Sequence, residues 1–153
     1  MGINAVRIPI PIEAILPTGA GKKYPDEKYG FMIKCYKNAM AHLKTVYEMG
    51  SKYRIAVYVT IVAKGEEEDQ TPEDVQYYLS GIENVVKRFH REDSFIGIDI
   101  NDGKFPKSLL GSYWRQAYDI IRKYSKDGLV ILSDLGKWQD IERSEMWPRL
   151  SPN

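Results

Sequence analysis

The sequence predicts an α/β fold in which four buried strands of a parallel sheet alternate with amphipathic helices. Short apolar runs, several of them rich in β-branched residues, recur along the chain and have the length and composition of buried strands. Longer segments with apolar residues at helical spacing lie between these runs. Buried strands joined by helices form parallel sheets through right-handed crossovers, so we expect this topology in one domain.

Four apolar runs predict the strands. Their expected positions are near residues 4–10, 55–62, 94–101 and 128–134. The first run is "NAVRIPI", the second is "YRIAVYVTIV" and the fourth is "GLVILSD". In the third run Ile96, Ile98 and Ile100 alternate with Gly97 and Asp99, and this mostly apolar run predicts a buried strand.

The first and third helices follow from apolar spacing. One helix is expected from Phe31 to Met49, with Gly50 ending it, and another from about Ser108 to Tyr124. The stretch before the first helix is rich in Gly, Pro and charge and predicts a loop.

The second helix carries a clear start signal. Thr71 can cap it, Pro72 suits the first turn, and Asp74 stands at the capping-box position, where Glu or Gln is more common. We expect this helix to run to about His90, whose imidazole would then interact with the helix C-terminus.

Composition narrows the classes of partner. The 153 residues are 43% hydrophobic and 28% charged, with a formal net charge of +1, so neither nucleic acid nor an anionic membrane is expected as the main partner. A single cysteine, Cys35, excludes an internal disulfide framework. The histidines and carboxylates do not form a convincing metal-binding pattern, and we expect no metal and no cofactor. The pattern of a secretory signal peptide is also absent from the sequence, which leaves the compartment unassigned.

The strand ends carry the candidate functional residues. In parallel sheets of this kind, function gathers at the carboxyl ends of the strands. Asn101, Asp102 and Gly103 follow the third strand, and Asp134 closes the fourth. Asp102 could be a catalytic acid, but Asn-Asp-Gly is also favourable turn chemistry, and position alone leaves both interpretations open.

The strand-end segments, taken in order, resemble glycoside hydrolase family 5, and most closely its exo-1,3-β-glucanase (glucan 1,3-β-glucosidase) branch. "GINAVRIPI" resembles the second-strand signature, and "YRIAVYVTIVAKG" is similar to the third strand. "VVKRFHREDSFIGIDINDG" resembles the helix and fourth strand before the Asn-Glu-Pro motif. "SYWRQAYDIIRKYSKDGLVILSD" is similar to the next helix and strand, so the resemblance covers nearly the whole chain.

The resemblance implies a (β/α)8 TIM barrel that hydrolyses β-glucosidic bonds with retention. Such enzymes use two carboxylates about 5 Å apart, one as nucleophile and one as acid/base. The acid/base position falls on Asp102 and the neighbouring amide on Asn101. The arginine that orders the carboxylates falls on Arg7, which could instead neutralise Asp102 or Asp134 in a structural role.

Several positions depart from the family pattern. Asp102 is one methylene shorter than Glu, and a misplacement of that size can slow a reaction by on the order of a hundredfold. Gly103 stands where the family has Pro, Val62 where it has a substrate-binding His, and Thr60 where it has an acidic residue. The strand is also one residue shorter than the family pattern, and such a slip turns side chains to the opposite face.

We therefore expect a partial (β/α)8 barrel that holds strands two to five and lacks the strand with the nucleophile. The first functional hypothesis is a glucan 1,3-β-glucosidase-like hydrolase of cell-wall β-glucan, impaired in catalysis. The alternatives are a non-catalytic β-glucan-binding module or decoy, and a truncated gene product without activity.

Sugar binding and self-association complete the expectations. Trp138 is the best candidate for stacking on a sugar ring, and Tyr113, Trp114 and Trp147 also lie near strand ends. The equally simple alternative is that Trp138 covers an edge of the core. An open half barrel exposes two strand edges, and a homodimer that completes the barrel would cover them.

Overall fold

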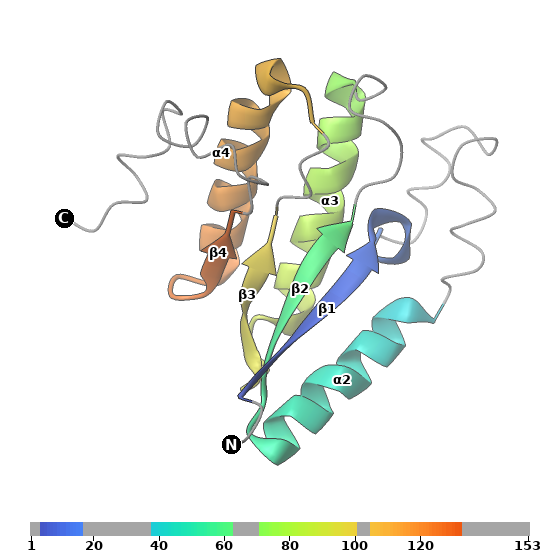
Figure 1. The fold of residues 1–153 in the computed structure, drawn as a ribbon, viewed down its shortest axis with the longest axis vertical. Coiled ribbons are helices and arrows are strands. Elements are labelled where there is room, and N and C mark those ends of the chain that lie inside the picture. The colour runs from blue at the N-terminus through green and yellow to red at the C-terminus, as the bar shows by residue number, and fades with distance from the viewer. Residues whose placement is uncertain (1–3, 17–37, 63–70, 101–104, 133–153) are drawn as a thin grey trace.

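The computed structural model describes residues 4–16, 38–62, 71–100 and 105–132 (Figure 1). In chain order its elements are β1 (Ala5–Pro11), the 3-10 helix η1 (Ile12–Ala14), α2 (Ala39–Tyr53), β2 (Ala56–Val62), α3 (Pro72–Phe89), β3 (Phe95–Asp99), α4 (Lys107–Tyr124) and β4 (Leu129–Ile131). The four strands form one parallel sheet in the order β1-β2-β3-β4. This arrangement confirms the predicted α/β class.

The strands lie where the sequence predicted them, with shorter ends at β3 and β4. The backbone pairing continues one residue past β3, because the Ile100 amide donates a hydrogen bond to the Ile131 carbonyl at 3.0 Å. The predicted part of the first helix before Asn38, and Ser133 and Asp134 of the predicted fourth strand, lie outside the described residues. The short helix η1 was not predicted.

Gly50 does not end its helix, contrary to the sequence prediction. Helix α2 continues to Tyr53, and Arg54 ends it in the left-handed conformation with φ of 56°. Gly50 is buried instead, and a Cβ there would lie 2.8 Å from the Ile55 carbonyl and from Val57. The glycine therefore lets α2 approach β2 closely, which is a packing role rather than a capping role.

The predicted capping box of α3 is present. The Thr71 hydroxyl accepts a hydrogen bond from the Asp74 amide at 3.3 Å, and the Asp74 carboxylate accepts one from the Thr71 amide at 2.9 Å. The two residues thus satisfy backbone donors that the first turn of a helix leaves open.

The core lies between the sheet and its helices. Figure 1 shows α3 and α4 side by side along the sheet, with α2 beside β1. Tyr47 of α2 stacks against Phe89 of α3 at 4.9 Å and against Phe95 of β3 at 5.9 Å, so α2 also joins this layer. Every second strand residue faces these helices, and the fully buried ones include Val57, Val59, Ile61 and Ile98.

Strand β3 departs from regular alternation of its side chains between the two faces of the sheet. Val57 pairs with Phe95 but Tyr58 pairs with Gly97, so Ile96 is an extra residue at a register shift. A Cβ at Gly97 would lie 2.1 Å from the Leu129 carbonyl oxygen. The backbones of β3 and β4 therefore approach so closely here that only glycine fits.

We expect Gly97→Ala to destabilise the protein by at least about 2 kcal/mol. The new Cβ would clash with the Leu129 backbone, which cannot move away as a flexible side chain could. Gly111→Ala is the matched control. A Cβ at Gly111, inside α4, meets nothing within 4 Å, so this variant should gain about 0.5 to 1 kcal/mol from helix propensity. Urea unfolding measures both free energies, and equal effects of the two variants would contradict the close approach at Gly97.

Candidate functional site

The face of the sheet away from the helices carries polar side chains. Arg7 pairs with Tyr58 in register, and Thr60 pairs with Asp99. Because successive strand residues point to opposite faces, these four side chains lie on the face opposite Val57, Val59 and Ile98. In a closed barrel this face becomes the interior.

Arg7, Thr60 and Asp99 form a connected polar cluster across three strands. Arg7 Nε donates a hydrogen bond to Thr60 Oγ1 at 2.7 Å. The Thr60 hydroxyl then donates to Asp99 Oδ2 at 3.2 Å, and Arg7 Nη2 lies 3.6 Å from the same oxygen. The hydroxyl thus links the guanidinium to the carboxylate through one accepted and one donated hydrogen bond.

Burial differs sharply within the cluster. The Asp99 side chain is 4% exposed and Thr60 is fully buried, whereas the Arg7 side chain is 56% exposed. A buried carboxylate is stable only with hydrogen-bond donors and a counter-charge, and Thr60 and Arg7 supply both. A guanidinium has five N–H donors, and because the Arg7 side chain is more than half exposed, donors beyond those facing Thr60 and Asp99 can bind a hydroxyl or carboxylate oxygen of a ligand.

A second buried carboxylate lies at the same end of the sheet. Glu13, in η1 directly after β1, is buried, and neither of its oxygens has a hydrogen-bond partner among the described residues. Ile12 and Ile15, on either side of it, pack against Gly81 of α3. Glu13 therefore belongs to the turn above β1 and does not join the polar cluster.

Of the four main site candidates, Arg7, Asn101, Asp102 and Trp138, the structure describes Arg7. Arg7 lies on the face of the sheet away from the helices, and its carboxylate partner among the described residues is Asp99. Asn101, Asp102, Trp138 and Asp134 lie outside the described residues.

Sequence reasoning placed Thr60 at a position that is acidic in the resembled family but gave it no role, and it missed Asp99 as a site residue. The sequence did carry a signal for both. In the parallel pairing, Arg7, Thr60 and Asp99 point to the same face of the sheet, and each is a polar residue in an otherwise apolar strand. Within the described ranges, no three His, Cys, Asp or Glu residues gather closely enough to hold a metal ion. No helix in the described part is long and apolar enough to cross a membrane.

Aromatic residues fix the end of β3, just before the predicted acid position. The Tyr113 hydroxyl donates a hydrogen bond to the Ile100 carbonyl at 2.5 Å. The Tyr113 ring stacks against Phe105 at 4.6 Å, and Tyr78 meets Phe105 edge to face at 5.0 Å. This aromatic cluster therefore fixes the backbone at Ile100.

Two of the aromatic residues considered for sugar stacking are core residues. Tyr113 and Trp114 of α4 are both buried, so neither offers a ring face to a ligand. Their apolar faces pack inside the helix layer, as large aromatic side chains commonly do in cores. Trp138 and Trp147 lie outside the described residues.

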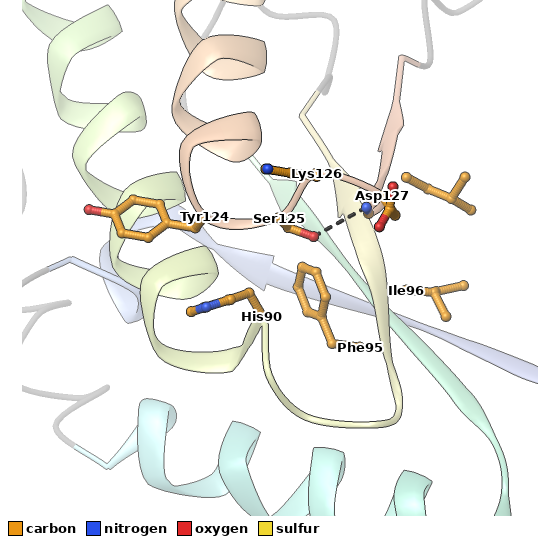
Figure 2. Close-up of a pocket in the computed structure, with 9 residues that line it drawn as sticks. His90, Phe95, Ile96, Tyr124, Ser125, Lys126 and Asp127 are labelled. Carbon is orange, nitrogen blue, oxygen red and sulfur yellow. Dashed lines mark hydrogen bonds between the residues drawn. The ribbon is translucent and has the colours of Figure 1, made fainter.

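A hollow of about 580 Å³ lies at the opposite, amino end of β3 and β4. Figure 2 shows Phe95 between His90 and the turn from α4 to β4, in which the Gly128 amide donates a hydrogen bond to Ser125 Oγ at 3.1 Å. The Nδ1 atom of His90 lies 3.0 Å from the Val86 carbonyl, which fits the expected role at the end of α3. Active sites of (β/α)8 barrels lie at the other end, so this hollow is separate from the polar cluster.

A hydrogen bond joins the helices beside this hollow. The Tyr124 hydroxyl donates to Glu83 Oε1 at 2.7 Å, and Lys123 Nζ lies 3.2 Å from the same oxygen. These contacts, first the Tyr124 hydrogen bond and then that from Lys123, lower the pKa of Glu83. The contact links α4 to α3 at the amino end of the sheet.

Comparison with known proteins identifies the fold. No protein-family model matches the sequence, and no curated protein matches it. Among solved structures, the chain is similar to an endocellulase from Pyrococcus horikoshii, an alanine variant in complex with cellotetraose. The TM-score is 0.56 at 16% identity, and the match covers 86% of this chain and 41% of the endocellulase chain.

The chain therefore has the fold of part of a (β/α)8 barrel, as the sequence predicted. Its four parallel strands and three helices match part of the barrel of that endocellulase. This is a distant structural relation to a glycoside hydrolase, and at this identity the likeness concerns the fold.

Thr60→Val should destabilise the protein by about 1 to 3 kcal/mol, because it removes a hydrogen bond from a buried carboxylate while keeping the side-chain shape. Thr60→Ser, which keeps the hydroxyl, should lose clearly less. Urea unfolding of both variants provides the measurement. Equal losses would show that the hydroxyl does not support Asp99.

Tyr113→Phe should destabilise the protein by about 1 to 2 kcal/mol, because the buried Ile100 carbonyl loses its donor. Tyr53→Phe is the control, since Tyr53 is exposed at the end of α2, and it should change stability by less than about 0.5 kcal/mol. Hydrogen exchange at the Ile131–Leu132 amides, next to the end of β3, should also quicken in Tyr113→Phe. Unchanged exchange and stability would contradict the proposal that the Tyr113 hydroxyl stabilises the end of β3.

Proposed function

We propose that this chain is a glycoside-hydrolase-like barrel segment that binds β-glucan oligosaccharides at the carboxyl end of its sheet and is impaired in hydrolysis. The preferred ligand is 1,3-linked glucan, because the strand signatures resemble the exo-1,3-β-glucanase branch of family 5. The single observation that carries it is the Arg7–Thr60–Asp99 cluster on the face that lines the interior of a barrel.

Arg7 supplies the binding chemistry in this proposal. Its Nε is held by Thr60 and its Nη2 faces Asp99, so the guanidinium is oriented before any ligand arrives. An oriented group loses little conformational freedom on binding. The exposed N–H donors can then bind sugar hydroxyls, and the resemblance implies a site role for this same arginine.

The fold relation supports a saccharide as the ligand class. The similar endocellulase was solved with cellotetraose. For the present chain a β-linked glucose oligomer is the natural first ligand to test. Asn101, Asp102 and Trp138 remain proposed contributors, with Asp102 at a degenerate acid/base position and Asn101 and Trp138 in substrate binding.

The number of carboxylates in the described strands supports impaired hydrolysis. A retaining glycosidase needs two carboxylates that face each other across the scissile bond. Among the residues of the four described strands, Asp99 is the single acidic side chain, and it is engaged by Thr60 and Arg7. We therefore propose binding with little or no turnover.

Calorimetric titration with laminari-oligosaccharides should show binding to the full chain. Cello-oligosaccharides, titrated in parallel, test the linkage preference. Arg7→Ala should weaken binding by on the order of 10- to 100-fold, because hydrogen bonds from a charged donor are lost. Arg91→Ala is the matched control, since Arg91 is an exposed arginine before the amino end of β3, and it should bind as the parent does.

A sensitive hydrolysis assay on the same samples tests the second half of the proposal. Absence of binding to either oligosaccharide series would refute the proposed function. Turnover comparable to that of an active glycosidase would refute the impairment and show that a second carboxylate is supplied from elsewhere.

A further inference from the structure

The hollow at the amino end of β3 and β4 combines apolar walls with charged groups at its rim. Its volume of about 580 Å³ lies within the range of about 300 to 1,000 Å³ that is usual for small-ligand sites. Phe95, Ile96 and Leu129 supply the apolar walls, and Lys126 and Asp127 supply the charges. The polar cluster lies at the other end of the sheet, so the two sites are independent.

Residues 125–128, with the sequence SKDG, form a well-anchored turn on one side of the hollow. Ser, Asp and Gly all favour turns, which suits the point where α4 ends. Ser125 Oγ accepts a hydrogen bond from the Gly128 amide at 3.1 Å. Arg122 Nη1 donates to the Ser125 carbonyl at 3.2 Å and to the Gly128 carbonyl at 2.6 Å. The two charged residues between them therefore extend from a fixed backbone.

Phe95 provides a ring against which an apolar group can pack. A Cβ at Gly128 would lie 3.4 Å from Phe95 Cε1, so the backbone of the turn packs directly against this ring. Phe95 also contacts Tyr47, with 5.9 Å between the ring centroids, and the Tyr124 hydroxyl is held by Glu83 at 2.7 Å. These side chains are ordered in the protein itself, so binding costs them little conformational entropy.

Lys126 and Asp127 are adjacent, exposed and of opposite charge (Figure 2). Neither has an ion-pair partner within the described ranges. A ligand with a single charge would be attracted by one of them and repelled by the other. A ligand that carries both charges close together is attracted by both, so the rim selects for a zwitterion.

We propose that the hollow binds a small zwitterion with an apolar side chain, and that a free aromatic amino acid is the ligand it fits best. Lys126 binds the carboxylate, Asp127 binds the ammonium, and the side chain packs against Phe95. An aromatic side chain is favoured because paired rings attract each other beyond the area they bury. A free amino acid carries both charges on one carbon atom, whereas a peptide separates them. The inference does not rest on the proposed glucan binding.

Calorimetric titration of the full chain with L-phenylalanine tests this site. We expect a Kd on the order of 1 mM, which is reasonable for a ligand of this size. Phenethylamine lacks the carboxylate and 3-phenylpropionate lacks the ammonium, so each should bind at least about threefold more weakly. L-alanine keeps both charges but has no ring, and it should also bind more weakly. Equal binding of any of these three compounds would overturn the proposal, because the group it lacks would then contribute nothing.

Two variants at the rim test the same contacts from the protein side. Lys126→Ala and Asp127→Asn should each weaken phenylalanine binding by about two- to fivefold, as expected for exposed ion pairs. Matched controls are Lys44→Ala, on the exposed face of α2, and Glu73→Gln, at the opposite end of α3. Both controls should bind phenylalanine as the parent does.

The ring contact has its own variant. Phe95→Leu keeps an apolar side chain but removes the ring, and it should weaken phenylalanine binding by about two- to tenfold. Urea unfolding shows whether this variant is folded. If it is not, the comparison of phenylalanine with alanine on the parent chain still tests the ring contact.

Two results would overturn the proposal outright. One is the absence of phenylalanine binding up to the solubility limit of the amino acid. The other is binding that neither Lys126→Ala nor Asp127→Asn weakens. Lys126→Ala should leave the titration with laminari-oligosaccharides unchanged, so the failure of this proposal and the failure of the proposed function are distinguishable.

Discussion

Parallel pairing of β2 with β3, which sets Thr60 opposite Asp99, is the constraint on which the rest of the molecule depends. It puts a carboxylate where the hydroxyl of the neighbouring strand can donate to it, and pairing of β1 with β2 then brings Arg7 within reach of both. The same register directs the intervening apolar residues toward the helices. One face becomes core and the other becomes a polar surface with a buried charge.

Sequence patterns predicted the parts of the fold that depend on local chemistry. The capping box of Thr71 and Asp74 is present as predicted, because it depends only on hydrogen bonds between residues three positions apart. Gly50 was wrongly predicted to end its helix. Its actual role is to allow close packing against Ile55 and Val57, and this contact exists only in the folded protein. The extra residue Ile96 is invisible in a strand whose sequence alternates normally, since a bulge is set by the neighbouring strand. Asp99 escaped notice for the same reason: its partners are about forty and ninety residues away in sequence.

In our proposal the Arg7–Thr60–Asp99 cluster serves as a binding surface rather than as a catalytic pair. Asp99 is neutralised by Arg7 and hydrogen-bonded by Thr60, so its negative charge is already compensated in the folded protein. A general acid or nucleophile needs a carboxylate that can respond to the substrate. The exposed part of Arg7, by contrast, keeps donors for a ligand while its inner part is fixed.

Spatial order of the strands follows their order in the chain, β1-β2-β3-β4, and each strand adds beside the one made before it. Each βα unit can therefore dock as soon as it leaves the ribosome, without waiting for a distant strand to insert between two others. Each pairing closes a loop of a single βα unit, from 51 positions between Ala5 and Ala56 to 32 positions between Gly97 and Leu129, which limits the entropy lost at each step. A chain built in this way can lose or gain whole units at its ends during evolution and still complete the remaining sheet.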